Sequence, residues 1–498
     1  MKNFLLKVYP SQEKLEKENQ LAWRLAEMAL DPAPLSQKAK EMLINRIIDN
    51  SAVALASLNR EPVIHARDQA LTHPVKSGAC LFGVDNKYRF SPDWTAWANG
   101  VAVRELDFHD TYLAEDYSHP ADNIPPLIAV AQYTGKNGRE LLAGLLSAYE
   151  IHISLVKGMC LHKHKIDHIA HLCPAQAGGL GALLNMSVEQ TYQAIQQAVH
   201  VSFTTRQSRK GEISSWKAYA PAFAGKMAIE AVDRALRGEK SPSPIYEGED
   251  SVVAWMLDGK SAQYDIPLVE KGEEKNSILE SYTKAHSAEY QAQALIDLAF
   301  ELREKIKDFS LIKQVRIYTS HHTHFVIGTG SGDPQKMSPS ANRETLDHSI
   351  SYIFAVALED GCWHHIDSYS KERANRPETV KLWHKVKTFE EKKWTDLYKH
   401  PDPNKRAFGG RVEIEMQSGE VITAEKKLAN AHPFGEKSFE RKDYIEKFLS
   451  LTEGIISKEE SDRFLNLVQN LENLSGGEVR QLNVQAGLSS KPVSQGIF

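Results

Sequence analysis

The sequence predicts a mainly α-helical protein in which an α+β segment interrupts the helical part. Apolar residues recur at the three- and four-residue spacing of helices from residue 11 to about residue 270. Residues 314–328 and 411–427 are instead rich in β-branched side chains, and the helical pattern returns from about residue 430. The returning helices are too few to bury a core of their own, so we expect them to pack on the first helical block.

This pattern divides the chain into two domains, one of them discontinuous. We expect an all-helical domain built from residues 1–272 and 428–498 and an α+β domain at residues 273–427. The chain has 498 residues, enough for two large domains or about three of average size.

Within the helical block, the start and end signals place the individual helices. A DPAP break at residues 31–34 separates the first two helical patterns, and a longer one covers residues 138–159. Ser187 followed by Gln190 fits a capping box at the start of the next helix. Residues 221–237 complete the block, with Pro221 predicted in the first turn.

The α+β segment contains signals of both kinds. Residues 314–328 predict a strand, and residues 411–427 predict a hairpin that turns at Ser418-Gly419. Residues 343–361 read as one helix between them, and the proline- and charge-rich stretch 366–409 as a surface excursion.

Composition bounds the class of protein. Hydrophobic residues make up 42% and charged residues 25%, as in ordinary globular proteins. The net charge of −5 argues against a nucleic-acid binder or a protein that binds anionic membranes, and no run of 18 apolar residues predicts a membrane span. The first 20 residues lack the apolar region of a secretory signal. Four scattered cysteines suit a reducing compartment, so we expect a cytoplasmic protein.

Histidines are unusually clustered, and the cluster has two interpretations. Four of the 20 histidines lie within ten residues: His162, His164, His168 and His171. His164 and His168 have the i, i+4 spacing of zinc ligands, but the flanking Lys163 and Lys165 would repel a cation. We therefore expect no metal. It also stays open that each of them is an ordinary structural histidine in the core or on the surface.

A second cationic segment follows and favours an anion pocket. Arg206, Arg209 and Lys210 lie in RQSRKG, and Lys217 follows a tryptophan at the edge of an apolar segment, where it would be partly desolvated. Lysine and arginine bind carboxylates through charge-assisted hydrogen bonds, and histidine transfers protons near neutral pH. These residues therefore fit a polycarboxylate substrate, although a run such as RQSRK can equally be a solvated face.

The densest polar group next to apolar flanks is DFHDT, residues 107–111, followed by SHPADNIPP, residues 118–126. Its prolines restrict the backbone, as a loop that holds side chains in fixed positions requires. It is a candidate catalytic loop.

Several long motifs resemble the MmgE/PrpD family over residues 15–480. They are ELDFHDTY, SHPADNIPP, HKIDHIAH, TTRQSRKGEISSWKAYAPAFAGKMA, SPSPIYEGEDSVVAWMLDG, YTKAHSAEYQAQA and AHPFGEKSF. The resemblance implies a homodimer whose subunit has a helical domain, an inserted α+β lid, and the active site between them. It also implies loss of water from 2-methylcitrate, giving 2-methyl-cis-aconitate in the methylcitrate cycle of propionate breakdown, without an iron–sulfur cluster or other cofactor. A relative with the same fold instead decarboxylates cis-aconitate.

The resemblance also implies particular site residues. The catalytic positions that match are Asp107, Thr111, His119, His168, Lys217 and His286. The expected substrate-binding positions are Arg206, Arg209, Lys210, Lys284 and His321. The chain departs from the family at His109, where relatives often have Asp, and around Lys284, where the usual proline-rich lead-in is replaced by SYTKAH.

These residues suggest a mechanism and leave several alternative functions open. We expect His119 and His168 to form an acid–base pair, with Asp107 orienting one imidazole. Lys217, with Arg206 or Arg209, would clamp carboxylates, and Thr111 would bond a substrate oxygen. The sequence leaves open which histidine is the acid, and it leaves open a decarboxylase, a zinc hydrolase and an inactive metabolite-binding scaffold.

Overall fold

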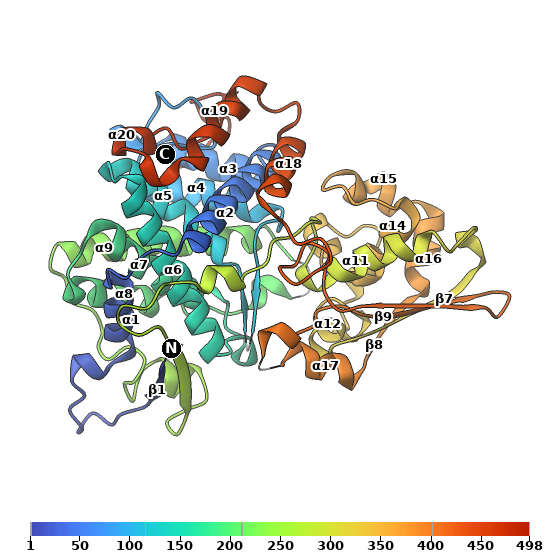
Figure 1. The fold of residues 1–498 in the computed structure, drawn as a ribbon, viewed down its shortest axis with the longest axis horizontal. Coiled ribbons are helices and arrows are strands. Elements are labelled where there is room, and N and C mark those ends of the chain that lie inside the picture. Colours follow the sequence, from blue (N-terminus) through green and yellow to red (C-terminus); the bar gives the residue numbers. More distant parts are fainter. Residues whose placement is uncertain (1, 115, 211–212, 401, 498) are drawn as a thin grey trace.

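The computed structural model describes residues 2–114, 116–210, 213–400 and 402–497. It is mainly helical, with a smaller α+β part, as predicted. Figure 1 shows the helical part on the left and the α+β part, with its four-stranded sheet, on the right. No helix in the described ranges is long and apolar enough to cross a membrane.

The helical part begins with nine main helices. They are α1 (Leu21–Leu30), α2 (Gln37–Ala56), α3 (Glu61–Leu71), α4 (Pro92–Glu105), α5 (Ile124–Thr134), α6 (Gly138–Gly158), α7 (Ile169–Leu184), α8 (Val188–Ser202) and α9 (Trp216–Leu236). The short α10 (Val252–Met256) follows. The predicted capping box of Ser187 and Gln190 is present at the start of α8, where each side chain bonds the other residue's backbone N–H.

The helical part also contains short strands that the sequence pattern did not predict. β1 (Lys2–Lys7) pairs antiparallel with β6 (Gln263–Leu268), and β3 (Gly83–Val84) pairs parallel with β11 (Gln485–Leu488). β4 (Tyr112–Leu113) and β5 (Tyr117–Ser118) pair antiparallel, and β2 (Pro74–Ala79) forms isolated bridges with Phe90. The pairs are only two to six residues long, too short for a clear alternating pattern.

The α+β part is built on one sheet of order β10-β9-β7-β8. Its strands are β7 (Ile312–Thr319), β8 (Val386–Glu390), β9 (Gly410–Met416) and β10 (Val421–Lys426). β9 and β10 form the predicted hairpin, and Gly419 in its turn has a φ of +87°, which glycine adopts without strain. The helices are α11 (Tyr290–Arg303), α12 (His321–Val326), α13 (Arg343–Leu346), α14 (Ile350–Asp360), α15 (Lys371–Ala374), α16 (Pro377–Lys385) and α17 (Lys392–Tyr398).

The C-terminal helices pack on the first helical block, as predicted. They are α18 (Arg441–Thr452), α19 (Lys458–Gln469) and α20 (Gly476–Val479), and they lie beside α2 to α5 in Figure 1. Phe448, Phe464 and Val479 belong to the same apolar core as the N-terminal helices, whereas a second core lies in the α+β part. The two cores do not follow the bounds 273–427 throughout, because Ile278, Tyr282 and Phe408 also belong to the first core, and the division at residues 273–427 stays a proposal.

Three local predictions were wrong. Helix α9 starts at Trp216, so Pro221 lies inside it rather than in its first turn. The strand predicted over 314–328 ends at Thr319, because Ser320 caps a helix there through the backbone N–H of Thr323. The helix predicted over 343–361 breaks into α13 and α14 at residues 347–349.

The stretch 366–409 is not a surface excursion. It contains α15 to α17 and the edge strand β8, and the side chains of Trp383 and Trp394 are fully buried. Pro377 lies in the first turn of α16, where a proline does not prevent helix formation.

The close approach of α6 and α7 makes a stability prediction. A Cβ atom on Gly179 would lie 2.6 Å from the Ala148 Cβ and 2.8 Å from the Gly144 carbonyl oxygen. Gly179→Ala should therefore lower the free energy of unfolding by about 1–3 kcal/mol through overpacking. Gly477→Ala in α20 is the matched control, since its Cβ would have only the Ser475 Oγ at 3.8 Å. Equal thermal midpoints for the two variants would contradict this packing argument.

Candidate active site

The site is centred on the buried carboxylate of Asp107, two residues beyond the end of α4. Its φ of +49° is unusual for a residue with a side chain and marks a constrained loop. Arg104, one turn earlier, pairs with this carboxylate. The Nζ of Lys217, from α9, lies 3.1 Å from one of its oxygens, and that of Lys284 lies 2.7 Å from the other. These three cations hold the pKa of Asp107 well below its usual value despite burial.

The α+β part inserts two more charged side chains into this cluster. Asp347 lies in the break between α13 and α14, and both its oxygens are 3.0–3.1 Å from the Lys217 Nζ. Arg343, on α13, lies 3.4 Å from Asp347 and also donates to the backbone oxygen of Leu106 at 3.1 Å. Lys217 is therefore held between one carboxylate from each part of the molecule.

The loop that carries Asp107 is also tied to the C-terminal helix α18. Lys447 donates to the backbone oxygens of Phe108 and Lys284 at 2.7 and 2.9 Å, and pairs with Asp49 at 2.6 Å. Two segments nearly 180 residues apart, each with a site residue, are thus joined by one buried ammonium group.

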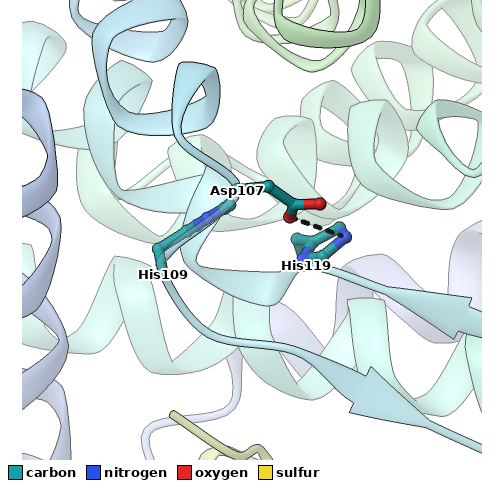
Figure 2. Close-up of side chains that lie close together, drawn as sticks. All are labelled: Asp107, His109 and His119. Carbon is teal, nitrogen blue, oxygen red and sulfur yellow. Dashed lines mark ion pairs between the residues drawn. The ribbon is translucent and has the colours of Figure 1, made fainter. Parts of the chain in front are cut away.

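His119 presents one ring nitrogen to this cluster (Figure 2). Its Nδ1 lies 2.8 Å from the backbone oxygen of Asp110, an acceptor, and 3.0 Å from the Thr111 Oγ1, so Nδ1 carries the proton. The Nε2, 3.9 Å from the Asp107 carboxylate, then has a free lone pair. Burial and the nearby Arg104 lower the pKa of His119 well below its usual value, which keeps the imidazole neutral.

His109 lies behind His119 and is fully buried. The two rings stack at 5.2 Å, and the His109 Nε2 lies 2.8 Å from the Asp122 carboxylate. Asp107, His109 and His119 approach one another closely enough to hold a metal ion. The donor set does not fit a cation, however, because Asp107 already contacts three buried cationic side chains that would repel it.

His168 is the second imidazole beside this cluster, its ring centre 5.7 Å from that of His119. Its Nδ1 lies 3.3 Å from Asp167, which Arg209 holds at 2.9 Å, yet neither ring nitrogen has a hydrogen-bond partner among the described residues. Burial and Arg209 lower its pKa well below the usual value. Buried polar atoms are almost always paired, so these nitrogens are available to a bound molecule.

A cleft of about 990 Å³ lies between the helical and α+β parts. Its charged lining, among the described residues, consists of five cations and one carboxylate: Lys165, Arg206, Arg209, Lys210 and Lys336 against Asp333. Four histidines also line it: His162, His164, His321 and His322. The Tyr117 ring lies between cleft and cluster, with its centre 5.5 Å from that of His162 and 6.4 Å from that of His168.

The inner cluster has an excess of positive charge. Among the described residues, the ion pairs of Arg104, Lys217, Lys284 and Arg343 are made with two carboxylates, Asp107 and Asp347, while burial raises the pKa of the neighbouring Glu289 to about 7. Uncompensated buried charge is costly, so such a cluster favours an anion with more than one carboxylate.

The structure gathers most of the predicted residues in two layers. Asp107, Thr111, His119, His168, Lys217 and Lys284 lie in the inner cluster, whereas Arg206, Arg209, Lys210 and His321 line the cleft. His286 is placed elsewhere: its Nε2 lies 2.9 Å from Asp297 and its ring packs edge-on against Phe300. His162 and His164 line the cleft, and His171 bonds the backbone oxygen of Met159.

Sequence reasoning missed several site residues. Arg104 was detectable, since it lies one helical turn before Asp107. Arg343 and Asp347 were hidden inside what read as a continuous helix, and Tyr117 had no signal apart from its loop.

Comparison with known proteins agrees with this two-part arrangement. The MmgE/PrpD N-terminal domain model matches residues 19–265, and the MmgE/PrpD C-terminal domain model matches residues 286–473. The chain belongs to the MmgE/PrpD family. The C-terminal match includes helices that pack into the first core, so the division by sequence family differs from the division by core.

Curated relatives of this MmgE/PrpD chain are dehydratases by name. A probable 2-methylcitrate dehydratase of Saccharomyces cerevisiae is 28% identical, covering 74% of this chain and 72% of its own. The 2-methylcitrate dehydratase of Salmonella typhimurium is 24% identical over 69% and 71% of the two chains. A fungal alkylcitrate dehydratase is 24% identical over 70% and 71%.

The Asp107 cluster predicts a large effect on stability. Asp107→Asn removes a buried carboxylate and leaves three cations poorly compensated, which should lower the free energy of unfolding by about 3–5 kcal/mol. Asp233→Asn, in an exposed pair with Arg237, is the matched control and should leave stability unchanged. Denaturant unfolding measures both. An Asp107→Asn variant as stable as the parent would show that the cluster does not depend on this charge.

Proposed function

We propose that this protein is a 2-methylcitrate dehydratase, which eliminates water from 2-methylcitrate to give 2-methyl-cis-aconitate by acid–base chemistry without an iron–sulfur cluster. The observation that carries the proposal is the buried cluster in which excess positive charge meets the unprotonated Nε2 of a neutral His119. Such a site suits an anionic carbon acid that must lose a proton. The names of the relatives supply the particular substrate.

His119 serves as the base in this proposal. Its Nδ1–H is fixed by the Asp110 backbone oxygen, which directs the Nε2 lone pair towards the cations around Asp107. When Nε2 takes the proton next to a substrate carboxylate, negative charge grows on that carboxylate. Lys217, Lys284 and Arg104 are already in place to stabilise it, so little reorganisation is needed.

His168 serves as a second group that contacts substrate. Because neither ring nitrogen has a hydrogen-bond partner among the described residues, it can donate to or accept from a substrate oxygen on the side facing Tyr117. The cationic cleft attracts the trianion, and two of its lining residues lie near the cluster: Arg206 over the Tyr117 ring, and Arg209 paired with Asp167 beside His168. Contacts from both parts to Lys217 support closure of the α+β part over the substrate.

A direct assay tests the reaction. Purified protein is incubated separately with 2-methylcitrate, citrate and cis-aconitate, and alkene absorbance and carbon dioxide are followed. We expect absorbance to grow with 2-methylcitrate and no carbon dioxide to be released. Carbon dioxide from cis-aconitate would instead assign a decarboxylase, and no turnover of any of the three would overturn the proposal.

Substitution of His119 and of His168 tests the roles of the two imidazoles. His119→Ala should reduce kcat by roughly 10²–10⁴-fold, the usual contribution of a general base, and His168→Ala by roughly 10²–10³-fold through the lost hydrogen bond to a substrate oxygen. His65→Ala, at an exposed position on α3, is the matched control and should keep the parent's activity. Near-parental turnover in both site variants would eliminate the pair.

We also propose that the protein acts in the methylcitrate cycle of propionate breakdown, as a cytoplasmic homodimer. Family membership supports this proposal. Sedimentation of the purified protein tests the dimer: a species of twice the chain's 55.9 kDa is expected, and a monomer at enzyme concentrations used for assay would contradict it.

A further inference from the structure

Elimination of water needs a proton donor as well as a base. The departing hydroxyl must receive a proton, or it leaves as hydroxide, a poor leaving group. Both imidazoles of the site are neutral, because burial lowers the pKa of His119 and of His168. Neither therefore carries an extra proton before substrate binds, and another group at the site is needed to supply one.

Glu289 is a further carboxyl group beside the charged cluster. It caps the start of α11, where its carboxylate accepts from the backbone N–H of Gln291 at 2.7 Å. Its own N–H donates to the backbone oxygen of Asp347, which holds Lys217, and it follows Lys284 by five residues. The capping position thus fixes this carboxyl beside the charged cluster.

Glu289 is also connected to the cleft. With its amide oriented so that both ends are satisfied, Gln291 donates to the Glu289 carboxyl. In that orientation its oxygen accepts from the His322 Nε2 at 3.2 Å and from the Tyr398 hydroxyl at 3.1 Å. His322 lines the cleft, and its ring centre lies 5.7 Å from that of Tyr117, next to His168. Glu289 therefore stands between the Lys284 side of the cluster and the cleft.

We propose that Glu289 is the general acid of this site and gives its carboxyl proton to the departing hydroxyl. This rests on the proposed dehydration. The His119 Nε2 takes the proton from carbon, the carbon–carbon double bond forms as the carbon–oxygen bond breaks, and the hydroxyl leaves as water with the proton from Glu289. The resulting carboxylate regains a proton from solvent, and His119 returns its own, so no oxidant or reductant is consumed.

The charges around Glu289 suit this role. Lys284, Lys217 and Lys336 favour its ionised form, whereas Asp107, the Tyr398 hydroxyl and above all burial oppose ionisation. The balance raises the pKa of Glu289 to about 7. The group is thus protonated below pH 7, and it loses the transferable proton as the pH rises above this value.

The test separates proton donation from the other steps by changing the leaving group. The probe is the 2-methylcitrate analogue with fluorine in place of the tertiary hydroxyl, because fluoride departs without a proton. Glu289→Gln should lose roughly 10²–10⁴-fold in kcat for water elimination and keep fluoride elimination near the parental rate. Glutamine keeps an oxygen for the helix cap, so the fold should survive, as thermal unfolding will check.

Two controls make the result decisive. Glu304→Gln, at the exposed end of the same helix, should keep both activities. His119→Ala should lose both, since each needs the base. The parent's kcat for dehydration should fall as the pH rises through about 7. This decrease should be absent from the pH profile of Glu289→Gln. Full water elimination by Glu289→Gln would overturn the proposal and make His168 the acid, whereas a parent inactive on both compounds would refute the dehydratase function instead.

Discussion

The buried carboxylate of Asp107 is the interaction on which the rest of the site depends. One side chain pairs with Arg104, Lys217 and Lys284, which come from three separate segments, and it lies within 4 Å of His119. Without it these cations would repel one another in a region with little water to screen them. The left-handed backbone at Asp107 is consistent with this, because strained conformations persist only where the surroundings hold them in place.

The same carboxylate explains why the protein needs two parts. Two carboxylates hold Lys217: Asp107 from the helical part and Asp347 from the α+β part. The ammonium group is thus fully coordinated only when the two parts meet, and a substrate carboxylate that enters the cluster must compete with, or replace, one of these contacts. The same contacts of Lys217 therefore serve both to place a positive charge for catalysis and to hold the two parts together when the cleft closes.

The sequence predicted the large features because they rest on periodicity over many residues. The long helices, the hairpin turning at Ser418-Gly419 and the return of the C-terminal helices all follow from such patterns. What it could not predict depends on contacts distant in sequence. At the break at residues 347–349, Ser349 caps α14 through the backbone N–H of Tyr352, a local signal, but the contact between Asp347 and Lys217 joins residues 130 positions apart. Likewise, His286 matched a family motif yet pairs with Asp297 because of where α11 packs. The pKa of Glu289 depends on its spatial neighbours and not on its sequence context.

Lys447 determines when the site can reach its final geometry during synthesis of the chain. Its ammonium group joins the backbone at Phe108 to that at Lys284, yet it belongs to one of the last helices of the chain. During synthesis on the ribosome, every residue of the inner cluster therefore emerges before the group that fixes the two loops together. A nascent chain can fold most of its helices early, but the cluster reaches its final geometry only when translation is almost finished.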